Sequence, residues 1–224
     1  MMDWSPIILS LKLAFLTTLI LFLLSIPLAY WLSQTQSRLK PFIEALVSMP
    51  IVLPPTVIGF YLLLTFSPNH VFGEWLAQGA GIRMVFSFGG LVFASLIYSL
   101  PFMVNPIQSA LASLPRSLSE ASFVLGKSKL ETLVKVLIPN IKSGLLTGVV
   151  LTFAHTVGEF GVVMMIGGSI PGETKVASIA IYEEVELLNY SNANTYSMVL
   201  IAITFSIIFS LYLYNRNTVA KLLP

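Results

Sequence analysis

The side chains with the clearest chemical potential are His155 and Glu159, which lie four residues apart in a strongly apolar stretch. An ionised carboxylate is costly in such surroundings. Glu159 can be accommodated by contact with His155 on the same helical face, by protonation, or by facing a partner on another helix. We favour a structural or gating role for Glu159 over contact with a substrate, and His155 is a further candidate for a pathway or gate. No metal site is expected, because His70 and His155 are far apart and the chain has no cysteine.

A second unusual feature is the group of prolines at Pro50, Pro54 and Pro55. Each proline removes a backbone donor and crowds the preceding turn, so residues 49–55 cannot form a regular helix. Within a bilayer, a broken backbone is tolerated only against protein or a water-filled cavity. Pro54 and Pro55 are therefore candidates for a pathway or gate. The alternative is a packing kink at the cytoplasmic end of a span.

The elements that carry these residues are apolar enough to lie in a membrane. Of the 224 residues, 56% are hydrophobic and 10% are charged, and the mean hydropathy is +0.87. A soluble domain needs about 25% charged residues, so we expect one integral membrane domain over residues 1–224. It should be an all-α helical bundle, because the runs lack the alternation of a membrane barrel. The five expected transmembrane helices cover residues 7–32, 42–66, 84–111, 141–166 and 195–214.

The basic residues are unevenly divided between the two sides of this bundle, which sets its orientation. Three lie on one side: Lys12, Arg83 and Lys175. Nine lie on the other: Arg38, Lys40, Arg116, Lys127, Lys129, Lys135, Lys142, Arg216 and Lys221. This predicts a multi-pass protein of the cell inner membrane, with its N-terminus outside and its C-terminus in the cytoplasm. We expect contact with the lipid bilayer, no nucleic-acid partner and no cofactor in this chain.

The cytoplasmic loop over residues 115–139 is the most informative segment. Two capping-box patterns follow one another, with Ser117 three residues before Glu120 and Ser128 three residues before Glu131. Gly126 lies between them, where a helix C-cap favours glycine. The loop is therefore predicted to form helix, turn and helix.

The second of these helices is expected to end before Pro139, which forces Ile138 out of the helical region. Its apolar residues recur at helical spacing and predict a single stripe, consisting of Leu130, Leu133, Val134 and Leu137. From physics alone, such a pair of helices either lies against the bilayer or bundle, or docks into another protein.

The loop also resembles a known motif. Residues 120–126 (EASFVLG) and 136–139 (VLIP) resemble the EAA motif of ABC-importer permeases, in which Glu-Ala-Ala is followed by glycine and then by Ile-x-Leu-Pro. The spacing matches throughout, with Ser122, Val136 and Ile138 as mild departures. The resemblance implies a role in ATPase coupling for Glu120, Ala121, Gly126, Ile138 and Pro139.

That family implies three protein partners. The loop would be the coupling helix that seats in a groove of a separate ATP-binding subunit. This chain has no Walker A pattern, so we expect it not to be an enzyme and ATP to be hydrolysed by that subunit. A second copy of the chain should complete a homodimer. A periplasmic or extracellular oxyanion-binding protein should deliver the substrate.

A second resemblance concerns the substrate. Residues 53–59 (LPPTVIG), 158–161 (GEFG), 167–172 (GGSIPG) and 180–182 (AIY) are similar to the molybdate permease subunits. Molybdate or tungstate is therefore the expected substrate, and sulfate or thiosulfate is the alternative because those permeases share part of the pattern. An ATPase-independent channel or secondary transporter is the second alternative, which the motif spacing of the cytoplasmic loop disfavours.

The external segment that follows this resemblance is acidic. Glu183, Glu184 and Glu186 are candidates for docking the binding protein. The alternative is that they belong to a solvated surface helix.

Overall fold

The computed structural model describes residues 3–220 and the side chains of residues 3–213, and this part is helical without any strand. Lys221 and the side chain of Arg216, which contributed to the predicted orientation, lie outside the described residues. The elements are α1 (Ser5–Gln34), α2 (Lys40–Val52), α3 (Pro55–Phe66), α4 (Val71–Gly79), α5 (Phe88–Ala112), α6 (Arg116–Val124), α7 (Lys129–Thr132), the π-helical turn η1 (Leu133–Leu137), α8 (Ile138–Asn140), α9 (Lys142–Val157), α10 (Gly161–Gly167), α11 (Ala177–Glu186) and α12 (Tyr190–Ala220).

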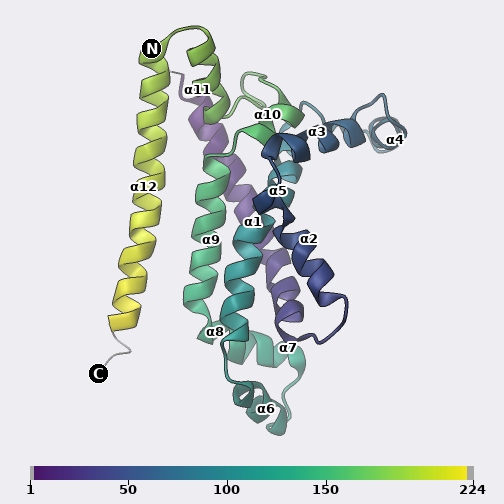
Figure 1. The fold of residues 1–224 in the computed structure, drawn as a ribbon, viewed down its shortest axis with the longest axis vertical. Coiled ribbons are helices and arrows are strands. Elements are labelled where there is room, and N and C mark those ends of the chain that lie inside the picture. The colour runs from purple at the N-terminus through teal and green to yellow at the C-terminus, as the bar shows by residue number, and fades with distance from the viewer. Residues whose placement is uncertain (1–2, 221–224) are drawn as a thin grey trace.

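Helices α1, α5 and α9 lie side by side and form the core of an elongated bundle (Figure 1). One end of the bundle carries α11 and the N-terminus, and the other carries α6, α7 and α8; we call them the α11 end and the α6 end. Two apolar clusters fill the interior. One contains the buried Leu13, Leu91 and Ile166, and the other, nearer the α6 end, contains the buried Met103 and Ile107.

Two glycines let α9 approach α5 closely. A Cβ atom at Gly144 would lie 2.4 Å from the Cβ of Ala110, and one at Gly148 would lie 3.2 Å from the backbone oxygen of Met103. The two positions are one turn apart, which is the small-residue spacing that supports close packing of membrane helices. The contact fixes α9, and the residues that follow it, against α5.

The membrane-spanning helices agree with the prediction in number only when bent helices are counted. Three helices, α1, α5 and α12, are each long and apolar enough to span a bilayer, and two further spans arise if each bent helix pair is one span. The first pair is α2 with α3, bent by 109°, and the second joins residues 129–140 to α9, bent by 79°. The fold is the expected all-α membrane bundle.

The break in the second predicted span lies at Leu53 and Pro54. Both have extended backbone angles, with ψ of 137° and 134°. Pro50, in contrast, lies inside α2. The prediction of an irregular stretch over residues 49–55 is therefore confirmed at its second half and wrong at its first half.

The fourth predicted span is not continuous to residue 166. Helix α9 ends at Val157, Gly158 caps it, and α10 begins at Gly161 after Phe160, whose φ and ψ are −127° and −64°. Glu159 therefore lies in a break between two helices. For this reason the prediction that His155 and Glu159 share one helical face is wrong.

The segment at the α6 end is the predicted helix, turn and helix, with one correction. Helix α6 begins at Arg116 directly after Pro115, so Ser117 lies within its first turn and caps nothing; the first predicted capping box is absent. The second box, between Ser128 and Glu131, is present in full. Gly126 adopts a φ of +76°, as predicted for the turn.

The end of that segment differs from the prediction. Ile138 keeps helical angles (φ −54°, ψ −45°) and Pro139 lies within α8, so the chain does not leave the helix before the proline. The wide turn η1 precedes Pro139, which has no N–H to donate to the carbonyl one turn earlier. This turn also divides the predicted apolar stripe: Leu133 and Leu137 are buried, whereas Leu130 and Val134 are exposed.

Helix α12 lies at the edge of the bundle, where it contacts α9 and α11 (Figure 1). Besides its contact with α9, it packs against α1 and α11 at the α11 end. There Tyr196 packs with Ile7, Ala177 and Ala180, and its hydroxyl donates to the backbone carbonyl of Asp3 at 2.7 Å. The first and last helices are therefore joined at this end of the bundle.

Candidate functional site

The two helix breaks meet in space, because α3 packs against α10. A Cβ atom at Gly59 of α3 would lie 2.7 Å from the Cβ of Met165 and 3.0 Å from the backbone of Val162. In the same way, a Cβ atom at Gly161 of α10 would lie 2.9 Å from the ring of Pro55. One glycine from each helix thus allows a contact that a larger residue would prevent.

Glu159 lies inside this region and is 4% exposed. The Ser95 hydroxyl of α5 donates to its Oε2 at 2.6 Å, and the Ser178 hydroxyl of α11 donates to its backbone carbonyl at 2.6 Å. Its Oε1 has no hydrogen-bond partner among the described residues. The structure therefore shows Glu159 facing a partner on another helix and not in contact with His155.

His155 is placed separately, against an aromatic face of α5. Its ring stacks on Phe102 with centroids 4.0 Å apart and lies 5.0 Å from the ring of Tyr98. Its Nδ1 is 3.0 Å from the Ser99 hydroxyl. No group of three or more potential metal-binding side chains occurs in the described part of the chain. His155 is thus a packed side chain with one polar contact.

The sequence-predicted gate candidates are therefore only partly assembled. Pro55 contacts Gly161, which lies two residues after Glu159, so the proline break and the Glu159 break adjoin. His155 lies outside that contact. The arrangement packs two interrupted helices closely against each other, at Gly59 and at Gly161.

A polar face on α2 and α5 was missed by the sequence reasoning. Ser48 of α2 and Asn105, Gln108 and Ser109 of α5 line one depression together with Glu44. The Gln108 amide donates to Glu44 Oε1 at 2.5 Å. The signal was present in the sequence, because positions 105, 108 and 109 follow helical spacing within an otherwise apolar span.

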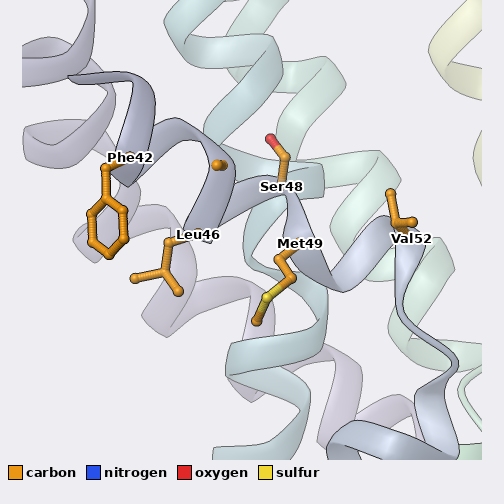
Figure 2. A pocket seen from close by; sticks show the side chains of 6 residues that line it. Phe42, Leu46, Ser48, Met49 and Val52 are labelled. Atoms are coloured by element: carbon orange, nitrogen blue, oxygen red, sulfur yellow. The ribbon is translucent and has the colours of Figure 1, made fainter. Parts of the chain in front are cut away.

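The neighbouring side of α2 is apolar. Figure 2 shows Phe42, Leu46 and Met49 projecting from one side of the helix, while the Ser48 hydroxyl points away from them. All three apolar side chains are largely exposed in the single chain. Helix α2 thus presents an apolar side and a polar side that point in different directions.

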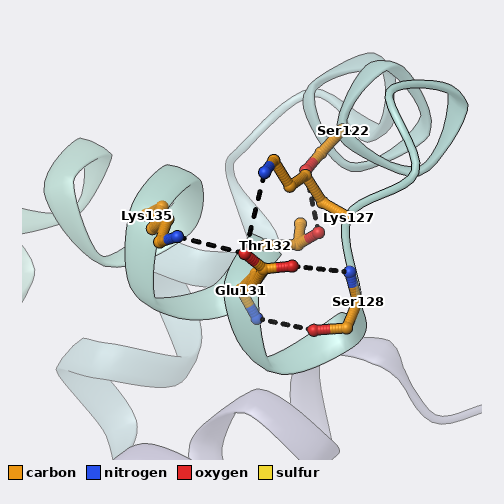
Figure 3. Close-up of polar contacts among 6 residues, drawn as sticks. All are labelled: Ser122, Lys127, Ser128, Glu131, Thr132 and Lys135. Carbon is orange, nitrogen blue, oxygen red and sulfur yellow. Dashed lines mark hydrogen bonds and ion pairs between the residues drawn. The ribbon is translucent and has the colours of Figure 1, made fainter.

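At the α6 end, hydrogen bonds and ion pairs hold the turn between α6 and α7 (Figure 3). The buried hydroxyls of Ser122 and Thr132 are 2.8 Å apart and join the two helices. Glu131 closes the capping box and also pairs with Lys127 at 3.7 Å and Lys135 at 3.0 Å. The hydrogen bond from Lys135, with help from Ser128 and Lys127, lowers the pKa of Glu131 below its ordinary value of 4.5.

The predicted coupling residues surround this turn and are mostly accessible. Glu120, Ala121, Gly126 and Pro139 are exposed, and Ile138 is half-buried. Large apolar side chains are exposed beside them: Phe123, Val124, Leu125, Leu130 and Val134. A firmly held turn therefore carries an apolar surface that the chain itself leaves uncovered.

The predicted acidic docking residues at the α11 end have different surroundings. Glu183 forms an ion pair with Lys175. Burial acts to raise the pKa of Glu183, but hydrogen bonding to Lys175 and Ser169, together with the charge of Lys175, lowers it below 4.5. Glu184 accepts from Asn189 Nδ2 at 2.7 Å, while Glu186 is exposed. Two of the three thus serve contacts within the chain.

Comparison with known proteins finds membrane components of transport systems. Residues 22–222 match the family described as binding-protein-dependent transport system inner membrane component. The chain is 43% identical over 215 residues to the molybdenum transport system permease protein ModB of Azotobacter vinelandii, covering 96% of this chain and 95% of that one. It is 33% identical over 172 residues to the sulfate transport system permease protein CysT of Escherichia coli, covering 77% of this chain and 62% of that one.

Solved structures show the same fold. A chain of the inward-facing MetNI methionine ABC transporter superposes with a TM-score of 0.73 at 18% identity, over 95% of this chain and 94% of that one.

Proposed function

This chain belongs to the family of inner-membrane components of binding-protein-dependent transport systems, and we propose that it is the permease subunit of an ATP-driven importer of molybdate or tungstate. The observation that carries the substrate is its 43% identity, over nearly the whole of both chains, to a molybdenum transport permease. The likeness to a sulfate permease is lower and covers less of both chains, so sulfate is the second candidate.

The segment from α6 to α8 is the proposed contact with a separate ATP-binding subunit. It leaves the bundle at one end, it is held by the Ser128–Glu131 capping box, and it exposes Phe123, Leu125 and Leu130. Exposed apolar side chains of this kind are typical of protein interfaces. Glu120, Ala121, Gly126, Ile138 and Pro139 belong to this surface or to the turn that supports it. ATP is then hydrolysed in the partner, and this chain needs no cofactor.

The contact between α3 and α10 is the proposed gate. Pro54 and Pro55 interrupt one helix, and Glu159 occupies the interruption of the other. Interrupted helices at membrane depth are tolerated where protein or a water-filled cavity surrounds them. His155, which stacks on Phe102, serves to position α9 against α5.

Three further parts complete the proposed importer. A second copy of the chain forms the other half of the passage. A binding protein for the oxyanion docks at the α11 end, where Glu186 is exposed. Glu183 and Glu184 instead bond to Lys175 and Asn189 within the chain. The α6 end faces the cytoplasm and the N-terminus lies outside.

Reconstituted vesicles test this proposal. Vesicles that hold this permease with its ATP-binding subunit should accumulate molybdate only when ATP and a molybdate-loaded binding protein are supplied. Accumulation without ATP would contradict the importer, and accumulation of sulfate alone would contradict the substrate.

The coupling role has its own test at Gly126. Valine at a φ of +76° is strained, whereas asparagine tolerates this region. Gly126→Val should therefore lose ATP-driven uptake, and Gly126→Asn should keep most of it. Equal uptake by the two variants would contradict a role for the turn in coupling.

A further inference from the structure

Four polar side chains share one depression at the α6-end half of the bundle. Asn105, Gln108 and Ser109 lie on α5 at helical spacing, and Ser48 of α2 completes the set, which we call the polar stripe. The depression has a volume of about 320 Å³ and is open to the surface of the chain. Side-chain hydrogen bonds of Ser48, Asn105 and Ser109 to other groups are absent from the part of the chain that the structure describes.

The depth of the stripe makes lipid an unfavourable neighbour. Asn105 lies seven residues before Ala112, the end of α5, which places it about 10 Å inside the helix end at 1.5 Å per residue. An amide that faces hydrocarbon without a partner is costly. Polar side chains at such depth therefore face a bundle interior or a water-filled cavity.

The chemistry of the stripe suits an anion. Hydroxyl and amide groups supply N–H and O–H donors without adding charge, and Gln108 keeps one amide hydrogen free after donating to Glu44. The negative charge of Glu44 is compensated by that bond and by Lys40, whose Nζ lies 3.8 Å from Glu44 Oε1. The depression thus offers donors to an oxyanion without an uncompensated carboxylate.

We propose that the polar stripe is the wall of the anion passage on the α6 side of the gate, where Asn105, Gln108, Ser109 and Ser48 contact a tetrahedral oxyanion. The passage is completed by the same stripe of a second copy. The exposed apolar side chains Phe42, Leu46 and Met49 project from the same helix as Ser48, away from its hydroxyl (Figure 2), and are available to pack against that second copy. This inference rests on the proposed importer function and adds the residues that face the substrate.

Because the chain has no cysteine, single cysteines report water access directly. The complex of permease, ATP-binding subunit and binding protein is prepared with Asn105→Cys or Ser109→Cys. Ile201→Cys and Phe205→Cys on α12 are controls, since these side chains are 61% and 66% exposed in the single chain and lie beside the exposed apolar side chain of Ile208. A charged, water-soluble methanethiosulfonate reagent is then applied.

The stripe variants should react at least about tenfold faster than the controls, because charged reagents do not enter hydrocarbon. Molybdate turnover should slow their reaction and leave the controls unchanged. Reaction of Asn105→Cys as slow as that of Ile201→Cys would overturn the proposal. Protection by sulfate but not by molybdate would support the passage while overturning molybdate as its substrate.

A second measurement uses charge. Asn105→Asp keeps the shape of the side chain and places a carboxylate in the passage, so it should lower molybdate uptake by about tenfold or more while ATP hydrolysis by the complex continues. Asn105→Ser keeps a donor and should retain most uptake. Unchanged uptake in the aspartate variant would overturn the contact with the anion.

Discussion

The Glu159 side chain is buried and, among the described residues, accepts one hydrogen bond, from the Ser95 hydroxyl. Removing the carboxyl group leaves the Ser95 hydroxyl buried without its acceptor, which costs about 1–3 kcal/mol. Glu159→Ala should therefore lower the thermal unfolding temperature of the purified complex. Glu159→Gln keeps an acceptor oxygen, so its unfolding temperature should be close to that of the original protein.

The pair can be tested as a unit. If the Ser95–Glu159 bond is the reason for the loss, Ser95→Ala should add little to Glu159→Ala in a double-mutant cycle. Additive losses from the two substitutions would show that they act separately.

Gly59 is a second position where one atom decides the packing. Gly59→Ala would bring a methyl group to 2.7 Å from the Met165 Cβ and 3.0 Å from the Val162 backbone, and overpacking of this kind costs about 1–3 kcal/mol. The yield of folded protein in detergent should fall. Gly158→Ala is the matched control, because its nearest neighbour would be 3.8 Å away. Similar yields from the two variants would show that α3 and α10 adjust to the extra atom.

The capping box of α7 is expected to contribute to binding of the ATP-binding subunit. Ser128→Ala removes the N-cap, which costs about 1 kcal/mol of helix stability, so association with the ATP-binding subunit should weaken by at most about fivefold. Ser117→Ala removes the same atoms from a serine that caps nothing, and it should associate normally. Binding of the purified ATP-binding subunit measures both; equal losses would exclude the capping box as the cause.

Glu131 adds a dependence on pH. Because its pKa is lowered in the folded chain, its contribution to the turn is complete above its ordinary pKa of 4.5 and is lost as the pH falls through the folded value. Association with the ATP-binding subunit should weaken below pH 4.5, and less so in Glu131→Gln. If association of Glu131→Gln weakens at low pH as much as that of the original protein, another titrating group is responsible.

The sequence predicted the long helices and the turn at Gly126, because hydropathy and local backbone preference decide them. The sequence-based prediction failed where the start or end of a helix depends on a neighbouring proline or on a residue far away in the sequence. Ser117 has the same spacing to a glutamate as Ser128, but Pro115 starts α6 earlier and places Ser117 in a helical conformation that an N-cap does not adopt. The break at Glu159 contains no proline, and Ser178, which donates to its carbonyl, is 19 residues away.

The two ends of the bundle carry different chemistry. If the α6 end is cytoplasmic, single cysteines at Ser37 and Ser117 should be labelled only from inside, and one at Asn69 only from outside. Labelling of intact cells and of inverted vesicles measures this. Labelling of Ser117→Cys from outside would reverse the proposed orientation and exclude coupling to a cytoplasmic ATP-binding subunit.

The marginal place of α12 has a consequence for how the chain is made. Synthesis proceeds from the N-terminus, and α1, α5 and α9 are all complete before residue 190 leaves the ribosome. The core can therefore assemble in the bilayer before the last helix exists. When α12 enters, the Tyr196 hydroxyl reaches the backbone of Asp3 and joins the newest part of the chain to the oldest. The hydrogen bond from Tyr196 to Asp3 can therefore form only after the core helices have been synthesised.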